Sequence, residues 1–396
     1  MNRVKTFYIN SKFIITIIVS LVICTLLSGC IPRSIIDELG ITHTIGIDEE
    51  NGKLTATVLY PNYTNNNKAS VIKTAADNPS TLKSNLGHKS QSQIVLGQIR
   101  TFVFGDSYSK AGISRVLETI CKDATIGNIT FVVSDLKAED IIKGLKTAPP
   151  LYLSHLLETS VLHEGTPETN IHTLINQYYG SGIDIYLPNI SFDNEKQLII
   201  NGLSIFKGDK LKLTISNKEA FLFKLMNDKN ISGYYDITLP IKNKQKGKEN
   251  DKQQKQNNDK KQGDDSEKRP GNENNFALKS LYGKHKITLH KKGNENIINM
   301  NLTLNVELKG IPESINIEKK EDYHYLKKSM EQIIAKDIET LLKKLQQNEV
   351  DPFGFGIIYR SENKEWNEKE FYKTIYPKMK FSVKTDLILR QLGVGE

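Results

Sequence analysis

Apolar and polar residues alternate along the first half of the chain in a pattern that predicts strands and helices following one another. Two β-branched segments, 40–48 and 53–60, flank Asn51-Gly52, a dipeptide typical of a hairpin turn, so they predict a β-hairpin. Further strands are predicted over 99–104 and 129–134, and helices over 69–86, 108–121, 138–145, 151–162 and 168–179. Strands that alternate with helices favour βαβ units and a partly parallel sheet.

The second half of the chain is richer in strand patterns. Short strands are predicted over 197–206, 210–215, 234–239, 276–289, 297–308 and 380–389, with a turn at Gly208-Asp209 and a short helix over 219–226. Between 323 and 346 the apolar residues recur at helical spacing, at Leu326, Met330, Ile333, Ile334, Ile338, Leu341, Leu342 and Leu345. This spacing predicts a long helix that packs one apolar stripe on a sheet and exposes a charged face.

A long polar stretch interrupts the strand patterns. Residues 242–275 contain no aliphatic or aromatic side chain. Such a segment cannot bury enough apolar surface to offset its ordering entropy, so we expect a disordered, solvated insertion between strands.

These patterns predict an α+β protein of about three domains, with mixed β-sheets and packed helices after a lipoprotein signal peptide. We expect the signal peptide at 1–29, an N-terminal α/β domain at 30–195, a middle β-rich domain at 196–305 and a C-terminal α+β domain at 306–396, with its long helix over 323–347.

The N-terminus has the layout of a secretory signal. Basic Arg3, Lys5 and Lys12 precede an almost wholly apolar segment over 13–27, which ends in the lipobox Leu27-Ser28-Gly29-Cys30. This apolar segment is shorter than the about 20 residues that a membrane-spanning helix needs, and no A-x-A site offers an alternative cleavage point. We therefore expect lipidation of Cys30 by S-diacylglycerol and N-acyl groups, and two chains or more suffice for stable membrane retention.

The charge and the cysteine content of the chain further limit the kind of protein that it can be. Removal of residues 1–29 leaves 367 residues and lowers the formal charge from +8 to +5, because three of the removed residues are basic. An exported protein does not meet nucleic acid, so this mild basic surplus suits anionic lipid headgroups. Apart from the lipidated Cys30, the mature chain has only Cys121, which excludes an intramolecular disulfide.

No recognised catalytic constellation is present in the sequence. Gly105-Asp106-Ser107-Tyr108-Ser109 lacks the closing glycine of a nucleophile elbow, and His163-Glu164 lacks the second histidine of a zinc motif. The eight histidines, at 43, 88, 155, 163, 172, 285, 290 and 324, have no metal-ligand spacing, and Cys121 is expected to be a buried small hydrophobe. We expect no catalytic residues, no metal site and no cofactor beyond the lipid on Cys30.

A succession of short motifs resembles a known family, the C-subunit lipoproteins of bacterial spore germinant receptors, Ger(x)C. The motifs in order are Glu38-Leu39-Gly40-Ile41 with Gly46-Ile47-Asp48, Val103 to Ile113 with Gly105 and Gly112, Leu187-Pro188, Gly202 to Leu211 with Phe206, and Asp351-Pro352-Phe353-Gly354-Phe355-Gly356. They extend over essentially the whole mature chain. The chain departs from the family at Ile31-Pro32-Arg33, where a Trp-Asp pair is usual, and in its longer polar insertion.

The resemblance implies a non-enzymatic receptor subunit of three α+β domains on the outer face of the inner spore membrane. It implies assembly with A and B membrane subunits and a requirement in nutrient-triggered germination; direct germinant binding stays open. We expect the motif residues to have a structural role, with partner contact as the alternative. These residues are Gly46, Asp48, Gly105, Gly112, Pro188, Gly202, Phe206, Asp351, Phe353, Gly354, Phe355 and Gly356. Gly202 and Gly208 suit turns, and Gly354 and Gly356 suit the end of the long helix.

Three other functions are compatible with an exported lipoprotein. The first is a solute-binding lipoprotein of an uptake system, a class of two doubly wound lobes that the β-rich second half of this chain disfavours. The second is a membrane-tethered hydrolase, which would gather His, Asp and Ser residues in one cleft. The third is an envelope scaffold without a signalling role.

Overall fold

The computed structural model describes residues 13–23, 39–62, 68–123, 127–149, 151–229, 231–239, 275–293, 295–309 and 319–390. Met1–Leu39 and Gly40–Glu396 form separate compact units. In the first unit, residues 13–23 form a helix whose apolar side chains are exposed. No helix in the described ranges is both long and apolar enough to span a bilayer. Cys30 with its lipobox and residues 242–274 of the predicted polar insertion lie outside the described residues.

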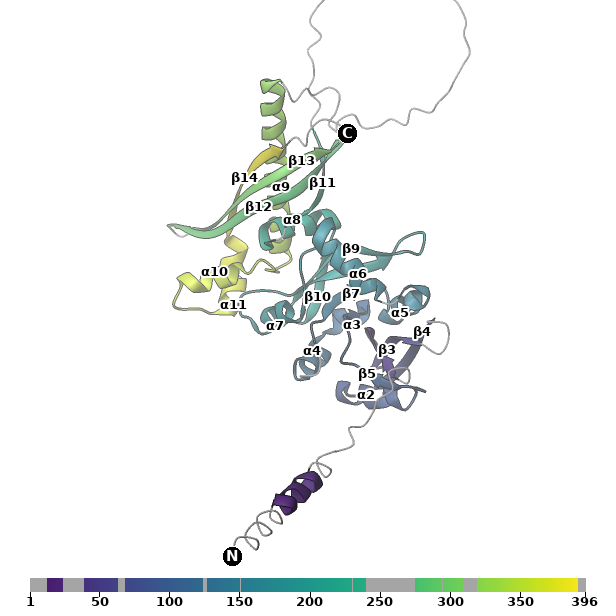
Figure 1. Ribbon diagram of the computed structural model, residues 1–396. Coiled ribbons are helices and arrows are strands. Elements are labelled where there is room, and N and C mark those ends of the chain that lie inside the picture. Colours follow the sequence, from purple (N-terminus) through teal and green to yellow (C-terminus); the bar gives the residue numbers. More distant parts are fainter. Residues whose placement is uncertain are drawn as a thin grey trace, which may run out of the picture. The chain divides into compact units, whose positions relative to one another are not determined.

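The first half of the second unit is built on an eight-stranded mixed sheet (Figure 1). Its strand order is β10-β9-β8-β7-β6-β2-β3-β4, in which β2, β6, β7 and β8 run parallel and the outer strands pair antiparallel. The strand bounds are β2 Thr44–Glu50, β3 Lys53–Asn62, β4 Lys68–Ala76, β6 Thr101–Phe104, β7 Thr130–Ser134, β8 Tyr186–Phe192, β9 Leu198–Lys207 and β10 Lys210–Ile215. A separate pair joins β1 Leu39–Ile41 to β5 Gln93–Val95.

Helices cover both faces of this sheet because its strands alternate apolar residues to the two sides. One core contains Ile45, Phe102 and Phe131 under α2, α3, α4 and α7, and the other contains Val103 and Val132 under α5 and α6. The helix bounds are α2 Pro79–Gly87, α3 Asp106–Ala111, α4 Ser114–Cys121, α5 Ala138–Gly144, α6 Tyr152–Thr159 and α7 Ile171–Tyr179, with short helical turns at Leu145–Thr147 and Ser160–Glu164.

A four-stranded sheet, β11-β12-β13-β14, forms the second half. Its strands are β11 Gly233–Thr238, β12 Asn275–Lys292, β13 Glu295–Lys309 and β14 Lys380–Arg390, and β13 and β14 run parallel. The helices are α8 Asn217–Asn227, α9 Lys320–Gln347, α10 Phe355–Glu362 and α11 Glu368–Glu370, with short turns at Phe371–Ile375 and Tyr376–Lys378. The apolar stripe of α9 packs on this sheet in a core that also takes in Tyr186 and Leu203 of the first sheet.

Several local predictions are confirmed. The hairpin forms, with Asn51 and Gly52 both at positive φ in its turn, and the long helix 323–347 lies within α9. The observed architecture is the α+β arrangement of mixed sheets with packed helices that the sequence predicts.

Two helix predictions are wrong. Residues 69–86 divide into the edge strand β4 and the helix α2, because the first part pairs with β3 and the Asn78 side chain caps a new helix. The predicted helix 108–121 is two helices, because Gly112 at φ 132° breaks the chain between α3 and α4.

The eight-stranded sheet continues across the predicted domain boundary at residue 195. β9 and β10 follow it in the chain but extend the eight-stranded sheet. All of Gly40–Glu396 belongs to one compact unit, and the three-domain spans stay a prediction.

Candidate functional site

Three motif residues hold helix α5 against the sheet. Asp48, at the end of β2, accepts hydrogen bonds from the N–H groups of Ala138 (2.8 Å) and Glu139 (2.9 Å) at the start of α5. A Cβ on Gly105 would lie 1.9 Å from Asp48 Oδ1, and one on Gly46 would lie 2.9 Å from Ala138 Cβ. Burial raises the pKa of Asp48, against the two N–H bonds that lower it. These contacts give Asp48, Gly105 and Gly46 a packing and capping role.

The last motif forms a buried carboxylate junction, which we define as Asp184, Lys207 and Asp351. The fully buried Asp351 accepts from the N–H groups of Phe355 (3.0 Å) and Gly356 (2.8 Å), and so caps the start of α10. Its own N–H donates to Asp184 Oδ2 (2.7 Å), which also accepts from Lys207 Nζ (3.1 Å). The junction therefore links the first sheet to the segment that follows the long helix.

Desolvation dominates the electrostatics of this junction. Burial, assisted by the nearby Asp184 carboxylate, raises the pKa of Asp351 to about 7, although two N–H groups favour its anion. Burial likewise raises the pKa of Asp184 against the attraction of Lys207. The Lys207 ammonium also lies 3.3 Å from the centre of the Tyr372 ring, a cation–π contact.

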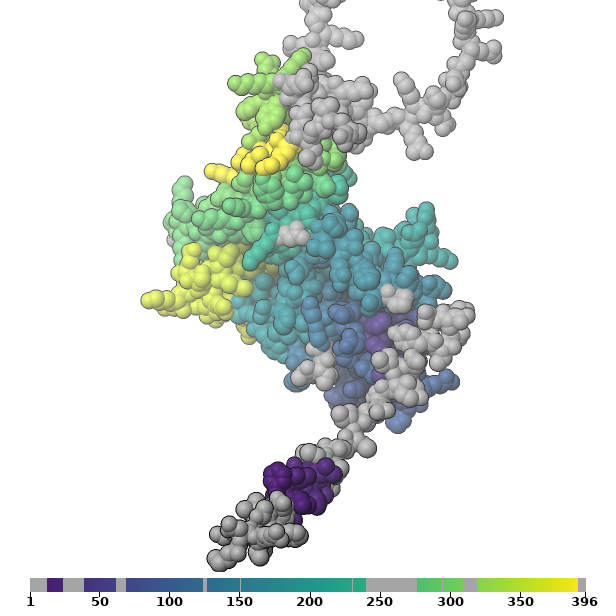
Figure 2. All heavy atoms as spheres, viewed as in Figure 1, coloured from purple at the N-terminus to yellow at the C-terminus, as the bar shows by residue number. Residues whose placement is uncertain are grey.

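Two glycines bring the backbones of the two halves together at this point. A Cβ on Gly356 would lie 2.6 Å from Gly182 Cα, and the N–H of Ile357 donates to the Gly182 carbonyl (3.1 Å). The Gly182 N–H in turn donates to Glu368 (2.8 Å). Figure 2 shows the yellow-green C-terminal segment seated against the teal part of the chain that carries Gly182. Only a residue without a side chain permits such an approach.

The motif phenylalanines extend the junction into the core. Phe353 lies 4.5 Å from Phe223 and 5.4 Å from Phe355, ring centre to ring centre. Phe355 is buried within 6.5 Å of the Tyr376 ring. Gly354, at φ 72°, turns the chain into α10 rather than ending α9. The predicted helix-end role of Gly354 and Gly356 is thus replaced by a helix-start role, because residues 348–351 already terminate α9.

The remaining motif residues lie in the sheet or against it. Gly202 lies inside β9 at φ 97°, and a Cβ there would meet the Ile215 carbonyl of β10 at 1.8 Å, so it serves close strand approach rather than the expected turn. Gly208 does form the turn between these strands. Gly112 faces Asp209, Phe206 is fully buried, and Pro188 pairs with Leu203 beside a register shift.

Asp184 and Lys207 were not singled out by the sequence. The only local signal is Ile183-Asp184-Ile185, in which one acid interrupts an apolar run. Sequence spacing does not reveal the partner of that acid, since Asp184 and Asp351 are 167 positions apart.

The described histidines and Cys121 do not assemble into a site. Among the described residues, no three His, Cys, Asp or Glu side chains are placed to hold a metal ion. His43 and His285 are partly buried, which lowers their pKa values. Cys121 is a half-buried free cysteine at the end of α4 rather than the fully buried one that the sequence predicts, and burial raises the pKa of its thiol.

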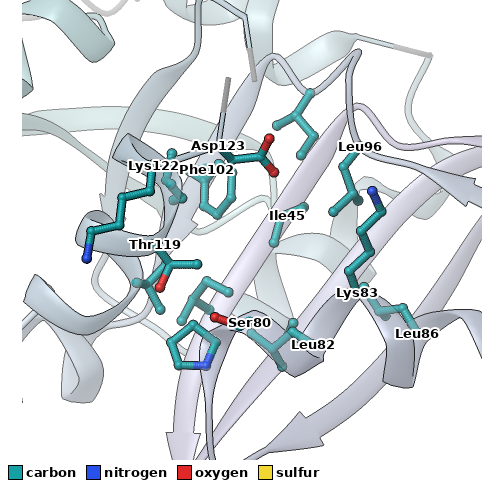
Figure 3. A pocket seen from close by; sticks show the side chains of 16 residues that line it. Ile45, Ser80, Leu82, Lys83, Leu86, Leu96, Phe102, Thr119, Lys122 and Asp123 are labelled. Carbon is teal, nitrogen blue, oxygen red and sulfur yellow. The ribbon is translucent and has the colours of Figure 1, made fainter. Parts of the chain in front are cut away.

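An apolar cavity of about 500 Å³ opens between the sheet and helices α2 and α4 (Figure 3). Its floor is formed by Ile45, Ile47, Ala56 and Phe102, and its mouth carries polar side chains. The lining residues are Ile45, Ile47, Ala56, Pro79, Ser80, Leu82, Lys83, Leu86, Leu96, Ile99, Phe102, Val116, Thr119, Ile120, Lys122 and Asp123. A second, more polar cavity of about 690 Å³ lies beside Asp184, Lys207 and Tyr372.

Comparisons with known proteins relate both halves of the chain to spore germination proteins. Residues 32–192 match the family described as spore germination protein N-terminal domain, and residues 201–393 match the one described as spore germination B3/GerAC-like, C-terminal. The spore germination protein GerQC of Bacillus cereus is 24% identical over 387 residues, 96% of this chain and 99% of that protein. The crystal structure of the GerBC protein has the same fold, with a TM-score of 0.54 and 14% identity over 88% of this chain and 97% of that one.

Proposed function

The chain belongs to the GerAC-like family of spore germination proteins, the C subunits of germinant receptors, and from that premise we propose that it is a lipid-anchored, non-catalytic receptor subunit. It is anchored by Cys30 to the outer face of the inner spore membrane. There it assembles with the A and B membrane subunits and is required for germination in response to nutrients. The observation that carries the proposal is the match of two family domains in order, over residues 32–192 and 201–393.

The buried polar groups support an assembly role over a catalytic one. In both Asp48 and Asp351, each carboxylate oxygen accepts a hydrogen bond from a backbone N–H group in the first turn of a helix. Both side chains are almost fully buried, so a substrate has no direct access to either carboxylate, and each positions the start of a helix. These motifs therefore support a rigid stack of elements beside membrane partners.

Deletion of the gene tests the receptor role. Spores of the deletion strain are expected to release dipicolinic acid more slowly after nutrient addition, and the restored gene is expected to return the wild-type rate. Normal release with every nutrient to which the parent strain responds would contradict the role.

Substitution of the anchoring cysteine tests the tether. Cys30→Ala is expected to move the protein out of the spore membrane fraction and to reduce germination, because the acyl chains are the attachment. Cys24→Ala is the matched control, since Cys24 lies in the same segment outside the lipobox. A Cys30→Ala protein that stays membrane-bound and functional would contradict the anchor. Co-purification of the A and B subunits with the wild-type chain tests the assembly.

A further inference from the structure

One face of the four-stranded sheet carries exposed lysines. The apolar stripe of α9 packs on the other face, where Leu289, Met300 and Leu387 are buried. Successive side chains of a strand point to opposite faces of the sheet, so the residues next to these three point away from α9. We define the basic sheet face by five exposed residues of β12 and β14 (Figure 1), which are Tyr282, Lys284, Lys286, Lys384 and Ile388.

The strand register brings the three lysines of this face together. Asn301 of β13 pairs with Lys286 on one side and with Lys384 on the other, so these lysines lie two strand spacings apart, about 10 Å. Lys284 lies two residues from Lys286 along the same side of β12, about 7 Å away. These spacings are close to the Debye length of about 8 Å at physiological salt, so the fields of the three ammonium groups add at the surface.

Nearby acids do not neutralise these lysines. Strand β12 contains no acidic residue. Each acid of β13 and β14 already has a basic partner, in the pairs Glu295–Lys380, Glu307–Lys309 and Asp386–Lys327. Within the described ranges of the chain, the three lysines of the basic sheet face have no hydrogen-bond or ion-pair partner. Their positive charge is therefore uncompensated by the protein.

The exposed side of α9 shows that this is a local property. Lys328, Lys336 and Lys343 are exposed there too. Glu339 lies one helical turn from both Lys336 and Lys343, and Glu331 lies one turn from Lys328, so each lysine has an acid at favourable helical spacing. The helix thus balances its own charges, whereas the basic sheet face does not.

Exposed apolar surface lies beside the lysines. Asn305 pairs with Tyr282 on one side and with Ile388 on the other, and these two side chains are 52% and 44% exposed. The Arg390 guanidinium lies 5.2 Å from the centre of the Tyr282 ring. At a membrane interface, tyrosine rings lie at the level of the headgroups and lysines are attracted to anionic lipids. Nucleic acid or an acidic protein offers no apolar layer that would accept Ile388.

We propose that the basic sheet face docks on a bilayer surface of anionic phospholipids. Lipid phosphates pair with the three lysines, and Tyr282 and Ile388 contact the boundary between headgroups and acyl chains. This inference goes beyond the proposed tether, because a lipid on Cys30 holds the chain near a membrane without deciding which face of the protein points toward it. Docking of the sheet supplies that orientation.

Lysine labelling of the lipidated full chain tests the docking. The chain is reconstituted on phosphatidylglycerol-containing vesicles and on pure phosphatidylcholine vesicles, treated with an amine-reactive acylating reagent and analysed by mass spectrometry. The three lysines of the basic sheet face are expected to react at least about fivefold more slowly on the anionic vesicles, because headgroup contact shields them. Lys328, Lys336 and Lys343 on the opposite side are internal controls and are expected to react equally on both. Equal rates for the basic sheet face on the two vesicles would overturn the proposal.

Two triple variants separate docking of this face from general attraction between a basic protein and an anionic surface. The sheet variant carries Lys284→Gln, Lys286→Gln and Lys384→Gln, and the control variant carries Lys328→Gln, Lys336→Gln and Lys343→Gln. All six lysines are exposed, so both variants are expected to fold. Lys292, on the same side of β12, is the reporter, and its protection on anionic vesicles is expected to disappear in the sheet variant alone. Loss of protection in both variants, or in neither, would exclude the basic sheet face.

The same vesicles distinguish this proposal from the proposed function. If the chain does not stay on the neutral vesicles, the tether at Cys30 fails, whatever the labelling on anionic vesicles shows. If the chain stays on both but the labelling rates are equal, the tether stands and the docking fails. Protection that appears only when the A and B subunits are reconstituted with the chain would assign the face to a protein contact and overturn membrane docking.

Discussion

Substitution of Gly356 by alanine tests the backbone contact that joins the two halves. Gly356 is the second residue of α10, and an added Cβ would lie 2.6 Å from Gly182 Cα and 2.8 Å from its carbonyl oxygen. Both neighbours are backbone atoms, so no side-chain rotation relieves the clash. The two segments have to separate, and the bond from Ile357 N–H to the Gly182 carbonyl (3.1 Å) lengthens or breaks.

The expected loss of folding stability follows from two destabilising contributions and one stabilising contribution. Overpacking costs about 1–3 kcal/mol. The carbonyl of the buried Gly182, left without its donor, costs about 1–3 kcal/mol. Alanine is a better helix former than glycine by at most about 1 kcal/mol. The free energy of unfolding is therefore expected to fall by roughly 2–4 kcal/mol, the middle of the range that these values allow.

The single tryptophan makes this contact measurable. Trp366 Nε1 donates to Ser181 Oγ (2.9 Å), next to Gly182, so its fluorescence reports on the junction during urea unfolding. Gly87→Ala is the matched control, because it makes the same change at the end of a helix with no atom within 4 Å of the added Cβ. A Gly356→Ala protein that unfolds at the same urea concentration as Gly87→Ala would refute the reasoning.

Three further predictions concern the motif residues. The raised pKa of Asp351, about 7 against an ordinary 3.8, means that its contribution to stability is present at about pH 4 and lost as the pH rises to about 7. The stability difference between wild type and Asp351→Asn is therefore expected to shrink over that range in urea titrations, and a constant difference would contradict the assignment. Gly105→Ala places a Cβ 1.9 Å from Asp48 Oδ1 and is expected to lower the free energy of unfolding by about 2–3 kcal/mol. Hydrogen exchange in α5 is expected to become faster, and exchange at the wild-type rate would count against the capping role of Asp48. Tyr376→Phe removes the buried hydroxyl that donates to the Val350 carbonyl (2.7 Å) and is expected to lower the free energy of unfolding by about 1–3 kcal/mol in a thermal unfolding assay. Tyr282→Phe, at an exposed tyrosine, is the control and is expected to lower it by less than about 0.5 kcal/mol in the same assay.

Local chemistry was readable from the sequence alone. Asn51-Gly52 can form its tight turn without any distant contact, because both residues tolerate positive φ, and the eight apolar positions of α9 define a buried face wherever the helix packs. Regular spacing within one element depends only on residues that are close in the chain, so the sequence alone is enough to recognise it.

Tertiary structure decided what the distant residues do to one another. Gly354 and Gly356 follow a long helix, which suggested a helix end, but their positions beside Asp351 and Gly182 make them the start of α10. Residues 69–86 have a helical composition in part, yet pairing with β3 turned the first portion into an edge strand. The contacts of Asp184 and Lys207, and the cavity beside Ala56, depend on segments that lie far apart in the chain. Sequence spacing within one element carries no information on such contacts, because burial and charge pairing are settled only when the sheets and helices pack.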